Sequence, residues 1–148
     1  MRLVIGSDHA GWPLKQTVID HIHSLGHEVV DVGSYDEAPV DFPDIARAVA
    51  QKVTSGEAAR GIMVCGTGVG ASIAANKMKG IRAAVCHDVH SAHQCVEHDD
   101  VNVMCIGAQI VGPWLAKDLI AAYLNAKFST AEEFRRRVAK LADMDAGR

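Results

Sequence analysis

Short apolar, β-branched runs alternate along the chain with longer segments in which apolar residues recur every three or four positions. The short runs predict strands and the longer segments predict helices, because the two structures repeat their side-chain directions with different periods. The expected strands are Leu3–Gly6, Glu28–Val32, Gly61–Cys65, Arg82–Cys86 and Val101–Ile106. They are continuously apolar, which is typical of strands that are buried on both faces of a parallel sheet.

Five helical patterns follow these strands, and Pro13 lies suitably in the first turn of the first pattern. The positions expected to form the helices and their apolar faces are Leu14, Val18, Ile22 and Leu25; Ile45, Val49 and Val53; Ile73 and Met78; Ser91–Val96; and Leu115, Leu119 and Tyr123. Strands that alternate with helices imply a parallel sheet covered on both faces by right-handed crossovers. The sequence therefore predicts an α/β fold, a Rossmann-like three-layer sandwich with a five-stranded parallel sheet, in one domain over residues 1–148.

An extra C-terminal helix is expected over Ser129–Met144. Ser129 or Thr130 together with Glu132 or Glu133 resembles a capping box. An apolar stripe runs along the same segment through Phe134, Val138 and Leu141. No strand follows this helix, so it has no place in the alternation. Two placements stay open: the helix packs on a neighbouring subunit, or it closes its own domain.

Composition narrows the classes of partner and location. The formal charge of −3 and the pI near 6.2 give no general reason to expect nucleic acid or an anionic membrane as partner. No run of about 18 apolar residues predicts a membrane span. The chain has four cysteines without a CxxC pair, which argues against a structural metal. Its length allows a core large enough to need no disulfides. Because the first apolar run is also too short for a signal peptide, we expect a cytoplasmic protein.

The glycine loop Cys65-Gly66-Thr67-Gly68-Val69-Gly70 is the strongest local signal for a binding site. Ligands of open parallel sheets bind beyond the carboxyl ends of the strands, and this loop follows the third expected strand. Its glycines let backbone N–H groups approach a ligand, and the helix that begins there favours an anion. A merely tight turn is the alternative interpretation. A phosphate group and a transient oxyanion both fit the loop.

Cys65 ends its strand against the start of that helix, a position that favours a reactive thiolate. Most cysteines in apolar strands are inert, and Cys86 and Cys105 are expected to be so. For Cys65 the catalytic and the structural interpretations both stay open on this ground alone. Asp8 and His9 follow the first strand and shift the balance toward catalysis, because they give the same sheet edge an acid and an imidazole for proton transfer.

His98 lies on the opposite side of the expected sheet from Cys65. It precedes the fifth strand, whereas Cys65 and Asp8 follow strands that run parallel to it. A strand of five residues separates the two edges by roughly 16 Å, which is too far for one substrate to bridge within a subunit. If His98 is catalytic, a neighbouring subunit should supply it; otherwise it is a surface or capping histidine. No histidine spacing in the surrounding segment 86–100 matches a known metal motif, so no metal site is expected.

A dinucleotide-binding module is a less favoured alternative. Gly66, Gly68 and Ala71 fit the loose dinucleotide fingerprint, and Asp88 lies 20 residues after Gly68 at a strand end. However, that fingerprint normally occupies the first strand–helix turn, and 148 residues leave no separate substrate domain for an NAD enzyme.

Nearly the whole chain resembles the type B ribose-5-phosphate isomerases and the related galactose-6-phosphate isomerase subunits. The segments that carry the resemblance are Gly6–Gly11, Asp41–Pro43, Cys65–Gly70, Ser72–Lys77, Gly80–Ala84 and His98–Asn102. The resemblance implies an aldose–ketose isomerisation of a phosphorylated sugar through a cis-enediolate, with ribose 5-phosphate and ribulose 5-phosphate as the expected pair. It implies no metal and no organic cofactor. It also implies a homodimer, or a dimer of dimers, with shared active sites.

The resemblance also implies roles for individual residues. Cys65 would be the base that moves a proton between C1 and C2, and His98 would assist ring opening. Thr67 and the amides of the loop glycines would stabilise the enediolate. The residues expected to bind substrate are Asp8, His9, Gly66, Gly68, Gly70, Asp99 and Arg137.

Three positions depart from the pattern of that family. Asp99 stands where asparagine is typical, Gln109 where arginine is common, and Glu133 where a phosphate-binding arginine precedes Arg137 by one turn. An added carboxylate and two absent cations weaken the expected grip on phosphate. The sequence therefore leaves open a different substrate: a tetrose or hexose phosphate, or an unphosphorylated sugar.

Overall fold

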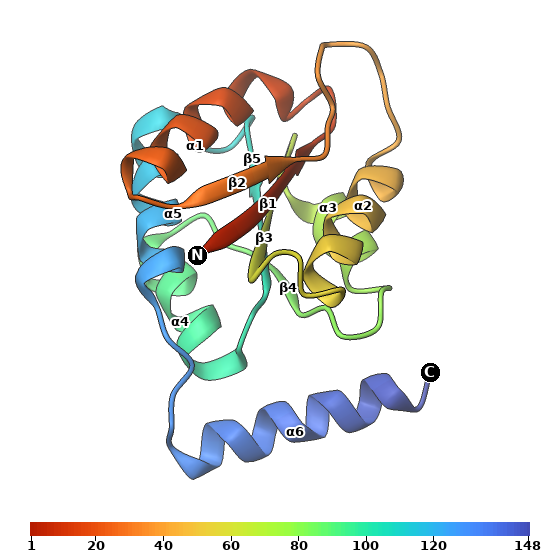
Figure 1. Ribbon diagram of the computed structural model, residues 1–148, viewed down its shortest axis with the longest axis vertical. Coiled ribbons are helices and arrows are strands. Elements are labelled where there is room, and N and C mark those ends of the chain that lie inside the picture. Colours follow the sequence, from red (N-terminus) through yellow and green to blue (C-terminus); the bar gives the residue numbers. More distant parts are fainter.

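The computed structural model describes all 148 residues, and its five strands form one parallel sheet with helices on both faces (Figure 1). The elements are β1 (Arg2–Ser7), α1 (Trp12–Ser24), β2 (Glu28–Asp31), α2 (Phe42–Thr54), β3 (Arg60–Cys65), α3 (Val69–Ala75), β4 (Ala83–Val85), α4 (Val89–Asp99), β5 (Val103–Gly107), α5 (Pro113–Asn125) and α6 (Glu132–Ala146). The strand order is β2-β1-β3-β5-β4, and every neighbouring pair is parallel. The predicted Rossmann-like α/β sandwich is confirmed.

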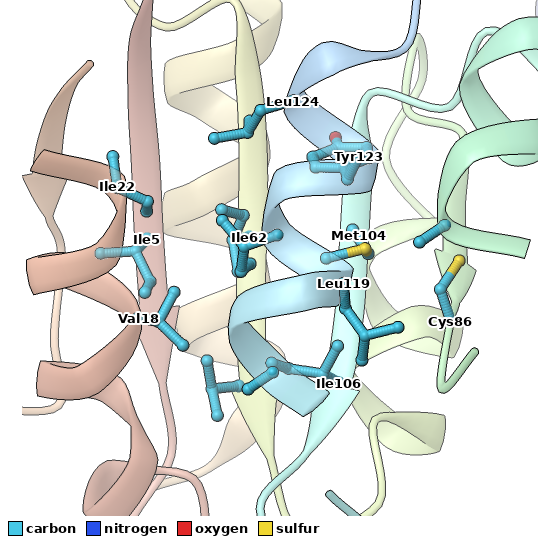
Figure 2. Packing of buried hydrophobic residues seen from close by; sticks show 14 of the residues in the cluster. Ile5, Val18, Ile22, Ile62, Cys86, Met104, Ile106, Leu119, Tyr123 and Leu124 are labelled. Atoms are coloured by element: carbon cyan, nitrogen blue, oxygen red, sulfur yellow. The ribbon is translucent and has the colours of Figure 1, made fainter. Parts of the chain in front are cut away.

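Two apolar clusters lie on the two faces of this sheet because successive strand residues point in opposite directions. On β3, Ile62 and Val64 face the larger cluster, which α1, α4 and α5 complete. Met63 and Cys65 face the smaller cluster under α2 and α3. Figure 2 shows the larger cluster, with Ile62 of β3 among side chains from β1, β5, α1 and α5. Cys65 therefore belongs to the α2–α3 side of the sheet.

The buried faces of α3 and α5 differ from the expected ones. Ile73 and Leu115 are exposed, whereas the smaller Ala71 and Ala116 are fully buried. On α5 the buried positions are Ala116, Leu119, Ile120, Tyr123 and Leu124, a complete helical stripe that begins on an alanine. Ile73 and Leu115, which were expected on the apolar faces of these helices, therefore lie outside the buried faces, because the expectation followed the largest apolar side chains. Close approach of a helix to the sheet selects small residues at the contact.

The extra C-terminal helix is present as α6, which crosses below the rest of the molecule and buries no residue of its own (Figure 1). The predicted capping box is wrong. The residue before the helix is Ala131, no side chain caps it, and Ser129 accepts a hydrogen bond from the backbone N–H of Ala131. The far end of α6 is tied to its own subunit, since Asp145 accepts from the Gly80 N–H at 2.6 Å. None of the six helices has the length and apolar character needed to cross a membrane.

Gly11 sets the distance between the loop after β1 and the end of β3. A Cβ atom on Gly11 would lie 1.9 Å from the backbone oxygen of Val64, so no larger residue fits without moving backbone. We expect Gly11→Ala to lower the free energy of unfolding by about 2–3 kcal/mol, because overpacking here cannot be relieved by a side-chain rotation. Urea denaturation measures this change.

Gly112→Ala is the matched control, because a Cβ atom there meets nothing within 4 Å and the backbone φ of −87° is open to any residue. We expect its free energy of unfolding to stay within about 0.5 kcal/mol of the wild-type value. Equal stability of the Gly11→Ala and Gly112→Ala variants would contradict the close backbone approach at Gly11.

Candidate active site

Asp8 and Cys65 come together at the carboxyl edge of the sheet. In the β1–β3 register Ser7 lies opposite Val64, so Asp8 and Cys65 are the next residues on neighbouring strands. The Gly11 contact described above presses the Asp8 loop onto the Val64–Cys65 peptide. Asp8 is 7% exposed, and one of its carboxylate oxygens accepts the Gly11 N–H at 2.9 Å. This bond fixes the direction of the carboxylate beside Cys65.

The Cys65 sulfur accepts a hydrogen bond from the backbone N–H of Gly68 at 2.9 Å. The loop can turn back in this way because Gly68 adopts a φ of +81°, a region that favours glycine. Cys65 itself is 4% exposed. The sulfur of Cys65 is therefore held against a backbone donor at the start of the loop. The seven-residue α3 that begins at Val69 is short, so this single N–H is the better-defined electrostatic feature of the loop.

The glycines of the loop serve different purposes. Thr67 has an exposed position, and its hydroxyl oxygen lies 3.4 Å from the Val69 nitrogen. A Cβ atom on Gly70 would lie 2.9 Å from the Phe42 ring of α2, so a larger residue here would have to displace that ring. That finding gives Gly70 a structural reason for being glycine, in addition to the substrate-binding role expected for it.

The segment 107–109 after β5 supports the glycine loop. The Ala108 N–H donates to the Cys65 carbonyl at 2.8 Å, and the Gln109 N–H donates to the Gly66 carbonyl at 3.0 Å. The Gln109 side chain lies over Gly66, where an added Cβ atom would come within 3.1 Å of its amide oxygen. Gln109 therefore belongs to the edge that carries Cys65, and its neutral amide lies over the first glycine of the loop.

Two histidines also lie at this edge. His9 is exposed, and its Nδ1 accepts the Val40 N–H at 3.2 Å, which orients the ring. His87 follows β4, and its Nε2 accepts the Gly107 N–H at 2.9 Å. His87 is not among the site residues expected from the sequence. The signal that could have found it is the place of the histidine directly after the strand that neighbours β5.

His98 and Arg137 lie at the opposite, amino edge. His98 is in the last turn of α4, and its ring stacks on Phe134 of α6 with the centroids 4.0 Å apart and 17° between the planes. The Arg137 guanidinium carbon lies 5.6 Å from the centroid of the same Phe134 ring. Within this chain the structure thus gathers the expected site residues into two groups, one at each end of the strands.

The charged residues around Arg137 do not replace the missing cation. Arg136 pairs with Glu132 at 2.6 Å, and Arg135 donates to the Ser129 carbonyl at 3.0 Å. Glu133 and Arg137 are both exposed. Asp99 lines a groove of about 770 Å³ between α6 and the body of the subunit. No group of three or more His, Cys, Asp and Glu side chains is placed to hold one metal ion.

A thiol that receives an N–H bond, an adjacent carboxylate and a glycine loop at the end of a parallel sheet form a site for proton transfer beside an oxyanion. An isomerase that moves a proton between neighbouring carbons can use groups of this kind. Comparison with known proteins agrees with it. Residues 3–141 match the family model described as Ribose/Galactose Isomerase.

Individual relatives cover nearly as much of the chain. Ribose-5-phosphate isomerase B of Escherichia coli is 43% identical over 127 residues, which is 86% of this chain and 85% of that protein. D-erythrulose-4-phosphate isomerase of Pectobacterium atrosepticum is 43% identical over 131 residues, again 86% and 85%. The solved structure of ribose-5-phosphate isomerase B from Clostridium thermocellum matches with a TM-score of 0.96 at 43% identity over 99% of each chain.

The chain therefore belongs to the ribose/galactose isomerase family, the sugar-phosphate aldose–ketose isomerases, and is an isomerase. This assignment confirms the resemblance on which the expected chemistry was based. It also favours the isomerase over the dinucleotide-binding module. The glycines that fit the dinucleotide fingerprint follow β3, whereas that fingerprint normally follows the first strand.

Proposed function

We propose that the protein converts ribose 5-phosphate to ribulose 5-phosphate through a cis-enediolate, with Cys65 as the base. The observation that carries this proposal is the Gly68 N–H bond to the Cys65 sulfur, 2.9 Å long, at the sheet edge that also holds the Asp8 carboxylate. The choice of ribose 5-phosphate is supported by the relatives from Escherichia coli and Clostridium thermocellum, which are both ribose-5-phosphate isomerases B.

In the proposed reaction the Cys65 thiolate removes the proton from C2 of the open-chain aldose. The electron pair of that C–H bond forms the C1–C2 double bond, and the carbonyl electrons move onto O1. Thr67 and the loop amides of Gly66, Gly68 and Gly70 stabilise this negative charge. The Cys65 thiol then returns the proton to C1, while the hydroxyl proton on O2 passes to O1. Asp8 holds sugar hydroxyls and His9 contacts the phosphate.

The amino-edge residues reach the reaction from a second copy of the chain. His98 and Arg137 gather on Phe134, and one five-residue strand, roughly 16 Å, separates this edge from Cys65 in the same subunit. Around α6 the groove of about 770 Å³ is lined on its apolar side by Ile81, Val101, Leu141 and Met144. Leu141 and Met144 are 43% and 72% exposed, which is a surface that a partner subunit would cover. The shared site would thus consist of Cys65 and Asp8 from one copy and His98 and Arg137 from the other.

A different sugar phosphate is the alternative substrate. The relatives that act on ribose 5-phosphate and on D-erythrulose 4-phosphate share the same 43% identity with this chain, so identity does not rank the two. Glu133 lies one turn before Arg137 on α6, and Asp99 lies next to His98 at the end of α4. A tetrose or hexose phosphate, or an unphosphorylated sugar, would be favoured if these charges weaken binding of the ribose 5-phosphate group.

Cys65→Ala tests the proposed base. We expect kcat for isomerisation to fall by about 10³-fold or more, because the variant lacks the group that carries the proton. Cys105→Ala is the control, since Cys105 lies in the same apolar cluster as Cys65 but is fully buried in β5. That variant should keep near-wild-type kcat at some cost in stability. Wild-type kcat in a folded Cys65→Ala variant would exclude the role.

Subunit mixing tests the shared site. Cys65→Ala and His98→Ala homodimers should each have little activity, because each lacks one half of every site. After random exchange at equal concentrations, half of the dimers carry both chains and one of their two sites is intact, so about one quarter of wild-type activity should return. Exchange that is demonstrated by mass spectrometry but restores no activity would contradict the shared arrangement.

Substitutions of Glu133 test how strongly the protein binds the phosphate group of its substrate. We expect KM for ribose 5-phosphate to fall from wild type to Glu133→Gln and further to Glu133→Arg, by about 10-fold or more in the last variant, because a charge-assisted hydrogen bond contributes about 1.5–3 kcal/mol. The free pentose provides the control, since its KM should not change along the series. The same assay on tetrose and hexose phosphates ranks the alternative substrates. An unchanged KM for every phosphorylated sugar would show that Glu133 does not face the phosphate.

A further inference from the structure

The backbone N–H of Gly107 donates a hydrogen bond to a side chain. At this position of a parallel sheet the usual acceptor is a backbone carbonyl of the neighbouring strand. The β4–β5 ladder pairs Ala83 with Val103 and ends where Val85 pairs with Cys105. The last backbone bond runs from the Cys86 N–H to the Cys105 carbonyl at 3.2 Å. In a continuing parallel ladder the Gly107 N–H would donate to a carbonyl of the neighbouring strand. Here His87 Nε2 accepts it instead, at 2.9 Å.

Gly107 is the point at which β5 touches the glycine loop. It is buried and pairs with Cys65 in the β3–β5 register. A Cβ atom on Gly107 would lie 2.6 Å from both the Gly66 carbonyl oxygen and the Thr67 Cα, so the two backbones are in direct contact. The next residues, Ala108 and Gln109, donate their N–H groups to the Cys65 and Gly66 carbonyls. Any displacement of Gly107 is therefore transmitted to the loop backbone.

The bond to Gly107 defines the chemical state of His87. Nε2 accepts a hydrogen bond only with a free lone pair, so the imidazole is neutral and carries its proton on Nδ1. Burial lowers the pKa of His87, which favours the neutral ring, although the field of Asp88 acts in the opposite direction. The Asp88 carboxylate is itself bound by Ser91, through its N–H and its hydroxyl at 2.7 Å each. Asp88 thereby anchors the loop that carries His87 to the start of α4.

We propose that His87 is a positioning residue for the isomerase reaction: its neutral imidazole holds Gly107 in place and thereby fixes the backbone of Gly66 and Thr67 beside Cys65. The inference rests on the proposed function, in which that backbone stabilises the enediolate. His87 acts through Gly107 and needs no contact with the sugar. Its effect should fall on the chemical step more than on binding, because the loop amides are used most strongly where negative charge develops.

Three substitutions at His87 separate an acceptor from a merely bulky side chain. His87→Gln keeps an acceptor oxygen at about the distance of Nε2, His87→Leu removes it, and His87→Phe keeps a planar ring without it. We expect His87→Gln to retain kcat within about threefold of wild type. We expect His87→Leu and His87→Phe to lose about 10- to 100-fold in kcat with KM changed less than about threefold, because small misplacements of catalytic groups cost rates of that order. Steady-state kinetics on the sugar phosphate turned over by the wild type, together with thermal unfolding, measures these effects.

Two kinetic results would overturn the proposal. The first is equal kcat in the His87→Gln and His87→Leu variants, whether high or low, because an acceptor for Gly107 would then not matter. A rise in KM with unchanged kcat would also overturn it and would place His87 in binding. If one apolar variant fails to fold, the other provides the comparison. Cys65→Ala separates failure of the proposed function from failure of this inference. An active Cys65→Ala variant refutes Cys65 as the base. An inactive Cys65→Ala variant together with a fully active His87→Leu variant refutes only the role of His87.

Discussion

Direct contact between backbones at the carboxyl edge of the sheet is the constraint on which the rest of this site depends. Gly11 lies against the carbonyl of Val64, and Gly107 lies against Gly66 and Thr67, at distances that exclude any Cβ atom. Three successive segments, after β1, β3 and β5, are therefore held together without side chains between them. Polar groups of the site can then be set by main-chain geometry, which varies less than the rotamers of long side chains.

This constraint explains how backbone N–H groups reach the largely buried Cys65 sulfur and the neighbouring Asp8 carboxylate. The αL conformation of Gly68 turns its N–H onto the Cys65 sulfur, and Gly11 turns its N–H onto Asp8. Both bonds come from backbone that is fixed by the contacts above. Preorganised donors of this kind stabilise developing charge without a reorganisation cost during the reaction. The chemistry therefore depends on the same glycines that close the sheet edge.

The sequence was sufficient for the sheet, the glycine loop and the separation of His98 from Cys65, because these follow from the period of apolar residues and the direction of parallel strands. It was not sufficient where small side chains or tertiary contacts decide. The buried face of α5 begins at Ala116, which carries little hydrophobic signal. Gly70 was expected to bind a ligand, and the structure also packs it against the Phe42 ring. The bond from Gly107 to His87 joins residues 20 positions apart across two strands, and no local pattern encodes it.

Under the proposed function, changes at the amino edge of the sheet can alter substrate choice without changing the Cys65 edge. Asp99 and Glu133, two of the three departures from the family pattern, lie on α4 and α6 at the amino edge with Arg137. They can alter the charge offered to a phosphate group while the Cys65 edge stays unchanged. Gln109 is the exception, because its amide lies over Gly66 within the chemical half of the site. This side chain is neutral and adds no cation beside Cys65, so under the proposed mechanism the hydrogen bonds of the loop backbone would supply most of the stabilisation of the enediolate charge.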